Sequence, residues 1–197
     1  MYTSLTRVLL PAWLPWLLLL GVCAVLQAIG GYPALRLDFP PTHGTWVYTV
    51  FSCHLVHLTT RHWLSDSLAL LVIGWIFVDA YNWKSWLLTC CLSALSVSVG
   101  LLMFHPGLRS YAGLSGVLHG LFTMGCLLLM PRQPRLAVGL MLLLLLKLLL
   151  EPFYGSLFMP TPGFTVASLA HVYGMIGGLL SWLTWISVLT LRSRHVV

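Results

Sequence analysis

The chain alternates between long apolar stretches and short polar connections. Uncharged stretches run through residues 8–35, 85–108, 110–131 and 152–191. Each is long enough for a helical span of about 20 residues, the length that crosses the hydrocarbon core of a bilayer. Two further candidate helices, at roughly 59–78 and 136–151, are interrupted by charged residues. The pattern therefore predicts an all-α membrane protein with six transmembrane helices.

Composition supports this prediction and limits the number of domains. Of the 197 residues, 59% are hydrophobic and 7% are charged, as is typical of an integral membrane protein. Six spans leave no room for a sizeable soluble domain, so we expect a single domain over residues 1–197. The net charge of +6 is not concentrated in a dense basic cluster. It therefore indicates contact with a bilayer and its anionic lipids and does not indicate nucleic acid.

The basic residues near the ends of the spans predict the orientation. With a cytoplasmic N-terminus and six helices, the inner side carries Arg7, Lys84, Arg132, Arg135, Arg192 and Arg194, and the outer side carries Arg36, Arg61 and Arg109. This bias predicts that both termini face the cytoplasm. Residues 31–58 then form a long outer loop whose aromatic residues suit the membrane interface. Residues 152–167 form a second outer loop.

The stretch GLSG at residues 113–116 contains the first candidate for chemistry. Ser115 follows a glycine-rich segment and is expected in the first turn of a helix, where backbone N–H groups lack intrahelical acceptors. Such N–H groups are ready donors for an oxyanion beside a nucleophile. The alternative is that Gly113 and Gly116 only allow two helices to pack closely.

The stretch AHVYGMIGG near the end of the chain contains the second candidate. His171, Gly174 and Gly178 are spaced to share one helix face, on which glycines permit the close approach of a partner helix. His171 is therefore a candidate general base for a serine on that partner. A haem ligand and a buried hydrogen-bonding histidine are alternatives. His119, four residues after Ser115 on the same face, is a competing candidate for the base.

The stretch HWLSD at residues 62–66 contains the third candidate. His62 and Asp66 are four residues apart on one helical face. They could line a water-filled cavity and hold developing negative charge, or they could bind a metal ion. The sequence has no HExxH motif, and a serine nucleophile needs no metal. We therefore expect neither a metal nor a cofactor.

Two charged residues lie near the outer end of the fifth predicted span. Lys147 and Glu151 are four residues apart in KLLLE, and charges inside a membrane are rarely left unpaired. The spacing predicts an ion pair. We expect it to act as a structural clasp and not to take part in catalysis.

These signatures together resemble those of the rhomboid intramembrane serine proteases. The resemblance rests on GLSG at 113–116, His171 with the following Gly178, and HWLSD at 62–66, in an order that agrees with a six-helix rhomboid-like bundle. It implies Ser115 as nucleophile and His171 as base, in a dyad without a catalytic aspartate. It also implies an oxyanion hole made by His62 and the backbone N–H of Ser115, supported by Leu114 and Asp66. His119 occupies a position where an aromatic ring packs beside the catalytic imidazole, so we expect it to stack on His171.

Asp66 is a departure from the rhomboid pattern, because many rhomboids have asparagine there. An ionised carboxylate cannot donate a hydrogen bond to an oxyanion. Either the carboxyl group stays protonated in apolar surroundings, or it orients His62. We expect the second.

The small six-helix chain, HWLSD and KLLLE are together similar to the rhombosortase branch of bacterial rhomboids. That similarity implies single-pass substrates with a C-terminal tail made of a Gly-Gly motif, a transmembrane helix and a short basic end. It places the active site near the outer face of the bacterial cytoplasmic (inner) membrane. Hydrolysis and transpeptidation both remain open. Two alternative functions are a catalytically inactive rhomboid-like membrane binding protein and a b-type haem membrane protein with His62, His119 and His171 as ligands.

Overall fold

Long helices make up most of the structure, a computed structural model that describes residues 3–41, 44–154 and 165–194. They are α1 (Thr3–Ala28), α4 (Thr60–Phe77), α5 (Trp83–Phe104), α6 (Ser115–Leu129), α7 (Pro134–Tyr154) and α8 (Thr165–Arg194). Shorter helices α2 (Tyr32–Leu35), α3 (Trp46–Ser52) and η1 (Cys53–Leu55) lie between α1 and α4. The chain is therefore mainly helical, as the apolar pattern predicts.

Two of the described helices have the length and composition of a membrane span. Trp83–Phe104 and Ser168–Leu191 meet both criteria, and Ala12–Ala28 and Ser115–Leu129 are shorter apolar helices. Many large apolar side chains are exposed on the surface. On α7, for example, Leu143 and Leu149 are 62% and 68% exposed. An outer surface of this kind suits lipid, because lipid tails are as apolar as leucine.

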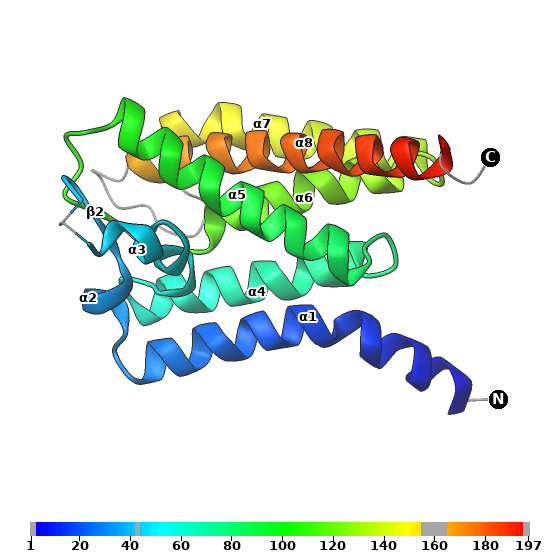
Figure 1. Cartoon of the computed structure of the whole chain (residues 1–197), viewed down its shortest axis with the longest axis horizontal. Coiled ribbons are helices and arrows are strands. Elements are labelled where there is room, and N and C mark those ends of the chain that lie inside the picture. The colour runs from blue at the N-terminus through cyan, green and yellow to red at the C-terminus, as the bar shows by residue number, and fades with distance from the viewer. Residues whose placement is uncertain (1–2, 42–43, 155–164, 195–197) are drawn as a thin grey trace.

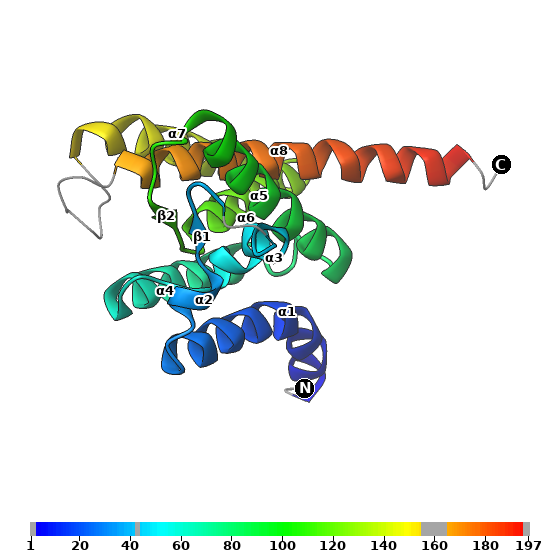
Figure 2. The same cartoon turned by 60° about the vertical axis from the view of Figure 1, so that its left-hand side comes forward.

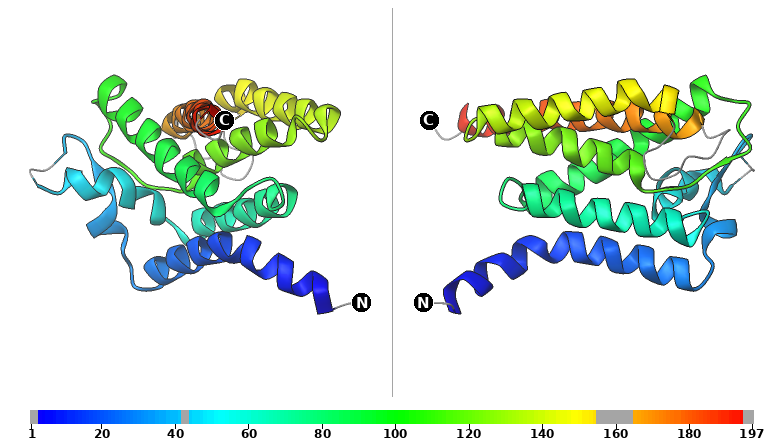
Figure 3. Two further views of the ribbon diagram at one scale, coloured as in Figure 1. Left: turned by 45° about the vertical axis from the view of Figure 1, so that its right-hand side comes forward. Right: turned by 180° about the vertical axis from the view of Figure 1, so that it is seen from behind.

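In the view of Figure 1 the long helices run lengthwise through the molecule, with α5 crossing obliquely. Helices α5, α6 and α8 pack against one another. Helix α8 packs against both α5 and α6, α4 packs against α6, and α1 packs against α4. Helix α7 contacts α6 and α8 from the other side. The two ends of the chain lie at the same end of the bundle as the α4–α5 and α6–α7 turns (Figures 1 and 3).

Glycines on facing helices set the distance between α6 and α8. A Cβ atom on Gly174 would meet the carbonyl oxygen of Gly116, and one on Gly178 would meet that of Gly120. The two backbones thus touch directly, which only glycine permits. This contact brings the start of α6 against the first half of α8.

The connection between α1 and α4 has more structure than the predicted loop. Strand β1 (Leu37–Asp38) pairs antiparallel with β2 (Ser110–Tyr111), with Leu37 opposite Tyr111. Figure 2 shows this pair beside α2 and α3, near the beginning of α6. The all-α fold class predicted from the sequence therefore holds for most of the described residues, and these short segments add one pair of two-residue strands to it.

Residues 110–114 form β2 and an irregular link, and α6 begins at Ser115, in agreement with the prediction that Ser115 lies in the first turn of a helix. One predicted boundary changes. The predicted outer loop at 152–167 is shortened from both sides, because α7 continues to Tyr154 and α8 begins at Thr165. Residues 155–164 of that loop lie outside the described residues.

Candidate active site

Ser115 is the first residue of α6, and the backbone before it is held in an unusual conformation. Gly113 has a φ of +139°, a region that side chains disfavour. Its N–H donates to the carbonyl oxygen of Cys53 at 3.0 Å. A Cβ atom on Gly113 would lie 2.6 Å from Cε1 of His62. Glycine therefore lets the imidazole of His62 lie against the backbone that leads to Ser115.

Helix α8 places His171 opposite Ser115. The distance from Ser115 Oγ to His171 Nε2 is 2.9 Å, and His171 is 4% exposed. If the hydroxyl donates to Nε2, this imidazole is the neutral tautomer with its proton on Nδ1. A hydroxyl hydrogen-bonded to a buried imidazole is the arrangement that activates a serine.

His119 lies on the far side of the His171 ring. The two imidazoles stack with centroids 4.0 Å apart and planes 12° from parallel, so the predicted stack is present. Nδ1 of His119 lies 2.7 Å from the backbone carbonyl oxygen of Ser115. That nitrogen therefore donates to the backbone, while the contact with the hydroxyl belongs to His171.

Asp66 on α4 has different main partners from the one we predicted. Its Oδ2 accepts the backbone N–H of Leu114 at 3.0 Å and lies 3.1 Å from Nε2 of His57. Nε2 of His62 is 3.4 Å away, which is long for a hydrogen bond. The contact between Asp66 and His62 is thus present but long, and its orienting role stays a prediction. The shorter contacts show that the carboxylate also holds the backbone of the residue before Ser115.

Two buried histidines that the sequence reasoning did not place in the site support this region. His57 is 2% exposed and contacts Asp66. His54, in η1 and outside the long helices, has Nε2 3.1 Å from the carbonyl oxygen of Ala94 and Nδ1 3.4 Å from that of Gly113. Burial lowers the pKa of His54 to about 4. Both histidines belong to the stretch HLVHL, but no helical spacing in the sequence predicts that this stretch contacts Gly113.

The predicted ion pair between Lys147 and Glu151 is present, but it is not remote from the other site residues. Lys147 Nζ lies 2.7 Å from Glu151 Oε2. The same oxygen lies 2.8 Å from Nδ1 of His171. The expectation of a purely structural clasp omitted this contact, because spacing within one helix does not reveal what a third residue on another helix touches.

Metal binding was the rival interpretation of the histidines and Asp66. Across residues 3–41, 44–154 and 165–194, no group of three histidine, cysteine or acidic side chains is arranged to hold a metal ion. The polar contacts of His57 and His62 described above are both with the carboxylate of Asp66.

Comparison with protein families decides the assignment of the chain. The model of the rhomboid domain matches residues 44–188, which include Ser115, His171 and all the residues around them. The chain belongs to the rhomboid family. Rhomboids are generally intramembrane serine proteases, and the serine and histidine of this rhomboid lie within hydrogen-bonding distance. A comparison with curated individual proteins finds no significant match.

Proposed function

We propose that this rhomboid is an active serine endopeptidase in which Ser115 is the nucleophile and His171 is the general base. The observation that carries the proposal is the 2.9 Å contact between Ser115 Oγ and His171 Nε2 at the start of a helix. The stacked ring of His119 supports it, because a packed neighbour limits rotation of the His171 imidazole.

The proposed reaction is acyl transfer in two steps. Ser115 Oγ attacks the scissile carbonyl carbon while His171 Nε2 takes the hydroxyl proton. The same proton then passes to the leaving amine as the peptide C–N bond breaks. Water, or another amine, attacks the acyl-enzyme and releases the serine, so either hydrolysis or transpeptidation completes the cycle.

The oxyanion would be held by His62 and the backbone N–H of Ser115. First-turn N–H groups have no intrahelical acceptor and point along the positive end of the helix dipole. The imidazole of His62 lies against Gly113, within reach of the same region. Leu114 and Asp66 act indirectly, because their mutual hydrogen bond fixes the backbone that carries Ser115.

We further propose six spans with both termini in the cytoplasm of a bacterium and an active site that opens toward the outer face of the inner membrane. Arg36, Arg61 and Arg109 belong to the end of the bundle that holds α2, α3 and the β1–β2 pair. Lys84 follows the α4–α5 turn, and Arg132 and Arg135 lie at the α6–α7 turn. Both turns are at the opposite end, with the two termini (Figures 1 and 3). The positive-inside rule supports this orientation.

The proposed substrates are single-pass membrane proteins with the rhombosortase type of C-terminal tail: a Gly-Gly motif, a helix and a short basic end. A peptide in a membrane helix is shielded by its own hydrogen bonds, so the substrate must unwind before Ser115 attacks. Glycine lowers this cost, because it is less favourable in a helix than alanine by about 1 kcal/mol.

The proposal is tested with the full chain in liposomes of phosphatidylethanolamine and phosphatidylglycerol. The model substrate is a single-span protein with a Gly-Gly junction and a basic tail, and a second version has Leu-Leu at the junction. We expect cleavage at the Gly-Gly junction by the wild type and none by Ser115→Ala or His171→Ala, with the Leu-Leu version cut more slowly. Cleavage of both versions at equal rates would refute the tail specificity. Cleavage by Ser115→Ala would refute the serine mechanism.

The same experiment bears on the two alternative functions, a haem membrane protein and a catalytically inactive binding protein. The ring nitrogens of His119 and His171 all contact protein groups: Ser115, Lys147 and Glu151. Ligation of haem by either ring would break at least one of these contacts. Intact protein without cleavage of either substrate would favour a binding function.

A further inference from the structure

The polar contacts of His171 extend beyond the proposed dyad, into α7. Glu151 Oε2 lies 2.8 Å from His171 Nδ1, on the side of the ring opposite Ser115. Glu151 is 5% exposed and His171 is 4% exposed, so the contact is shielded from water. Buried charges are costly unless paired and hydrogen-bonded, and this carboxylate has two donors on one oxygen.

One arrangement of protons satisfies all the close contacts except one. His119 Nδ1–H donates to the carbonyl oxygen of Ser115, which leaves Nε2 to accept from Lys147 at 2.9 Å. Lys147 also donates to Glu151. Glu151 Oε2 then accepts Nδ1–H of His171, and Nε2 of His171 accepts the hydroxyl of Ser115. In this arrangement Nδ1 carries a proton, so the 2.9 Å approach of Lys147 Nζ to Nδ1 is only a contact and not a hydrogen bond.

This arrangement fixes the tautomer that a general base needs. A proton on Nδ1 leaves the lone pair of Nε2 free to take the proton of Ser115, and a wrong tautomer costs a serine protease about 10⁴-fold in rate. When His171 becomes an imidazolium, the carboxylate of Glu151 faces the positive charge. Lys147 balances that carboxylate in the resting state. Titratable side chains on other elements around these groups include His62 and Asp66 on α4, His57 before α4, and Tyr111 on β2.

We propose that Glu151 is a positioning residue that completes a Ser115–His171–Glu151 triad, with Lys147 as the counter-ion of its carboxylate. This inference rests on the proposed serine protease function. Glu151 acts through His171 and touches neither substrate nor the reacting carbonyl. The sequence predicted a dyad of Ser115 and His171 with His119 stacked on the imidazole, and the proposed triad adds Glu151 to this dyad.

The test compares the rate at which a fluorophosphonate modifies Ser115 in detergent-solubilised protein, together with the thermal unfolding midpoint of each variant. Glu151→Gln keeps the shape and removes the charge. The double variant Lys147→Leu and Glu151→Leu replaces the pair by apolar residues, which is often neutral or stabilising for folding. The control is Asp38→Asn, which breaks the partly exposed ion pair with Arg36 outside the site.

We expect Glu151→Gln and the double variant to lose about 100-fold in rate, the low end of what a general base contributes. The double variant should keep its unfolding midpoint, whereas Glu151→Gln should unfold at a lower temperature, because it leaves the charge of Lys147 without its carboxylate. Glu151→Asp should react faster than Glu151→Gln, because it retains the charge. The control should stay within about twofold of the wild type, since exposed pairs contribute little. A double variant that folds and reacts like the wild type would show that the pair is only a structural clasp.

A second readout separates this inference from the proposed function. A neutral imidazole whose Nδ1–H is bound to a carboxylate gives a proton NMR signal at unusually low field, and the signal should be lost in His171→Gln and Glu151→Gln. If the wild type shows no such signal, the triad is refuted even where a variant fails to fold. If the signal is present but the wild type is not modified by the fluorophosphonate, the hydrogen bond stands and the proposed protease function fails.

Discussion

Asp66 shows how one side chain holds the backbone that leads to Ser115. Its carboxylate accepts the N–H of Leu114 and contacts His57, both in buried surroundings. Leu114, the residue before Ser115, is thereby tied to α4. An asparagine at this position still has an oxygen that accepts the same N–H.

We therefore expect Asp66→Asn to keep most of its reactivity toward a fluorophosphonate. Asp66→Leu should lose reactivity and lower the free energy of unfolding by about 1–3 kcal/mol, because it removes the nearer acceptor of a buried backbone N–H and leaves only the longer contact with His57. Reaction rates and thermal unfolding of the two variants measure this difference. Equal behaviour of Asn and Leu would mean that the hydrogen bond to Leu114 is unimportant.

His54 makes the fold sensitive to acid. Burial lowers its pKa to about 4, from 6.5 for an ordinary histidine. Below about pH 6.5 the unfolded chain takes up a proton that the folded chain does not, so stability falls as the pH drops toward 4. At about pH 5 the loss amounts to about 2 kcal/mol relative to neutral pH.

The variant His54→Gln keeps an amide donor for Ala94 and does not titrate. We expect the unfolding midpoint of the wild type to fall more between about pH 7.5 and about pH 5 than that of the variant, because only the wild type has the proton linkage of His54. Parallel pH dependence of the two proteins would contradict the assignment.

At the residue scale the sequence identified Ser115, His171, His62, Asp66 and His119, and the structure brings these side chains together. Spacing along a helix places Lys147 beside Glu151, but it carries no information on the contact with His171, which lies 20 residues further on and on another helix. His54 and His57 were not predicted as site residues, for a related reason. They precede α4 in a stretch without period, and their partners are distant in sequence.

Among the elements, the seam between α6 and α8 controls the distance between Ser115 and His171. A Cβ atom at Gly174 would meet the backbone carbonyl of Gly116, one residue after Ser115. Backbone cannot move aside as a flexible side chain can. Any residue larger than glycine must therefore push the two helices apart.

We expect Gly174→Ala to lower the unfolding midpoint and to reduce the rate of modification of Ser115 by at least tenfold, since a displacement of about 1 Å can cost about 100-fold. The matched control is Gly139→Ala on α7, where a Cβ atom meets nothing within 4 Å. The control should be neutral or stabilised by about 1 kcal/mol, the helix preference of alanine over glycine. If Gly174→Ala keeps the unfolding midpoint and the modification rate of the wild type, the contact between α6 and α8 does not control the distance between Ser115 and His171.

The long apolar helices were predictable from the sequence, and the short helices and strands were not. The candidate at 59–78 corresponds to α4 (Thr60–Phe77), and the candidate at 136–151 lies within α7 (Pro134–Tyr154). The short helices α2 and α3 and the β1–β2 pair lie in a stretch without apolar period. Their positions depend on contacts with distant segments, such as Leu37 opposite Tyr111.

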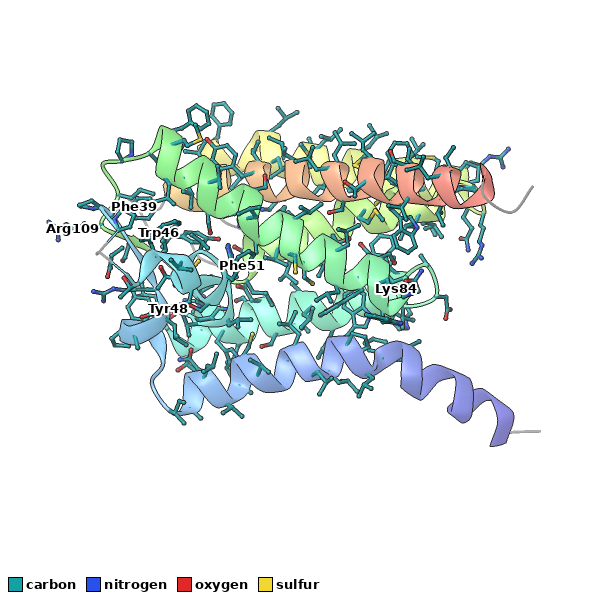
Figure 4. The ribbon with its side chains drawn as sticks, in the orientation of Figure 1. Phe39, Trp46, Tyr48, Phe51, Lys84 and Arg109 are labelled. Atoms are coloured by element: carbon teal, nitrogen blue, oxygen red, sulfur yellow. The ribbon has the colours of Figure 1, made fainter. Side chains whose placement is uncertain are left out.

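For the whole molecule, charged and aromatic residues mark its two ends. Trp46, Tyr48 and Phe51 of α3 are exposed near one end, and Lys84 lies near the other (Figure 4). Trp83 is 62% exposed beside Lys84. Aromatic residues favour the two membrane interfaces, and basic residues favour the cytoplasmic side.

This arrangement predicts the sidedness of two exposed arginines. In a background without the five native cysteines, a membrane-impermeant maleimide added to intact cells should label Arg109→Cys and should not label Arg135→Cys. Permeabilised cells should give labelling at both positions. Labelling of Arg135→Cys alone in intact cells would reverse the proposed orientation.

The central claim is that His171 activates Ser115 for covalent catalysis. The most direct measurement is the mass of the purified protein after treatment with a fluorophosphonate, followed by peptide mapping of the adduct. We predict one adduct, on Ser115, in the wild type and none in Ser115→Ala or His171→Ala at the same exposure. An adduct on another residue, or equal modification of folded His171→Ala, would contradict this account.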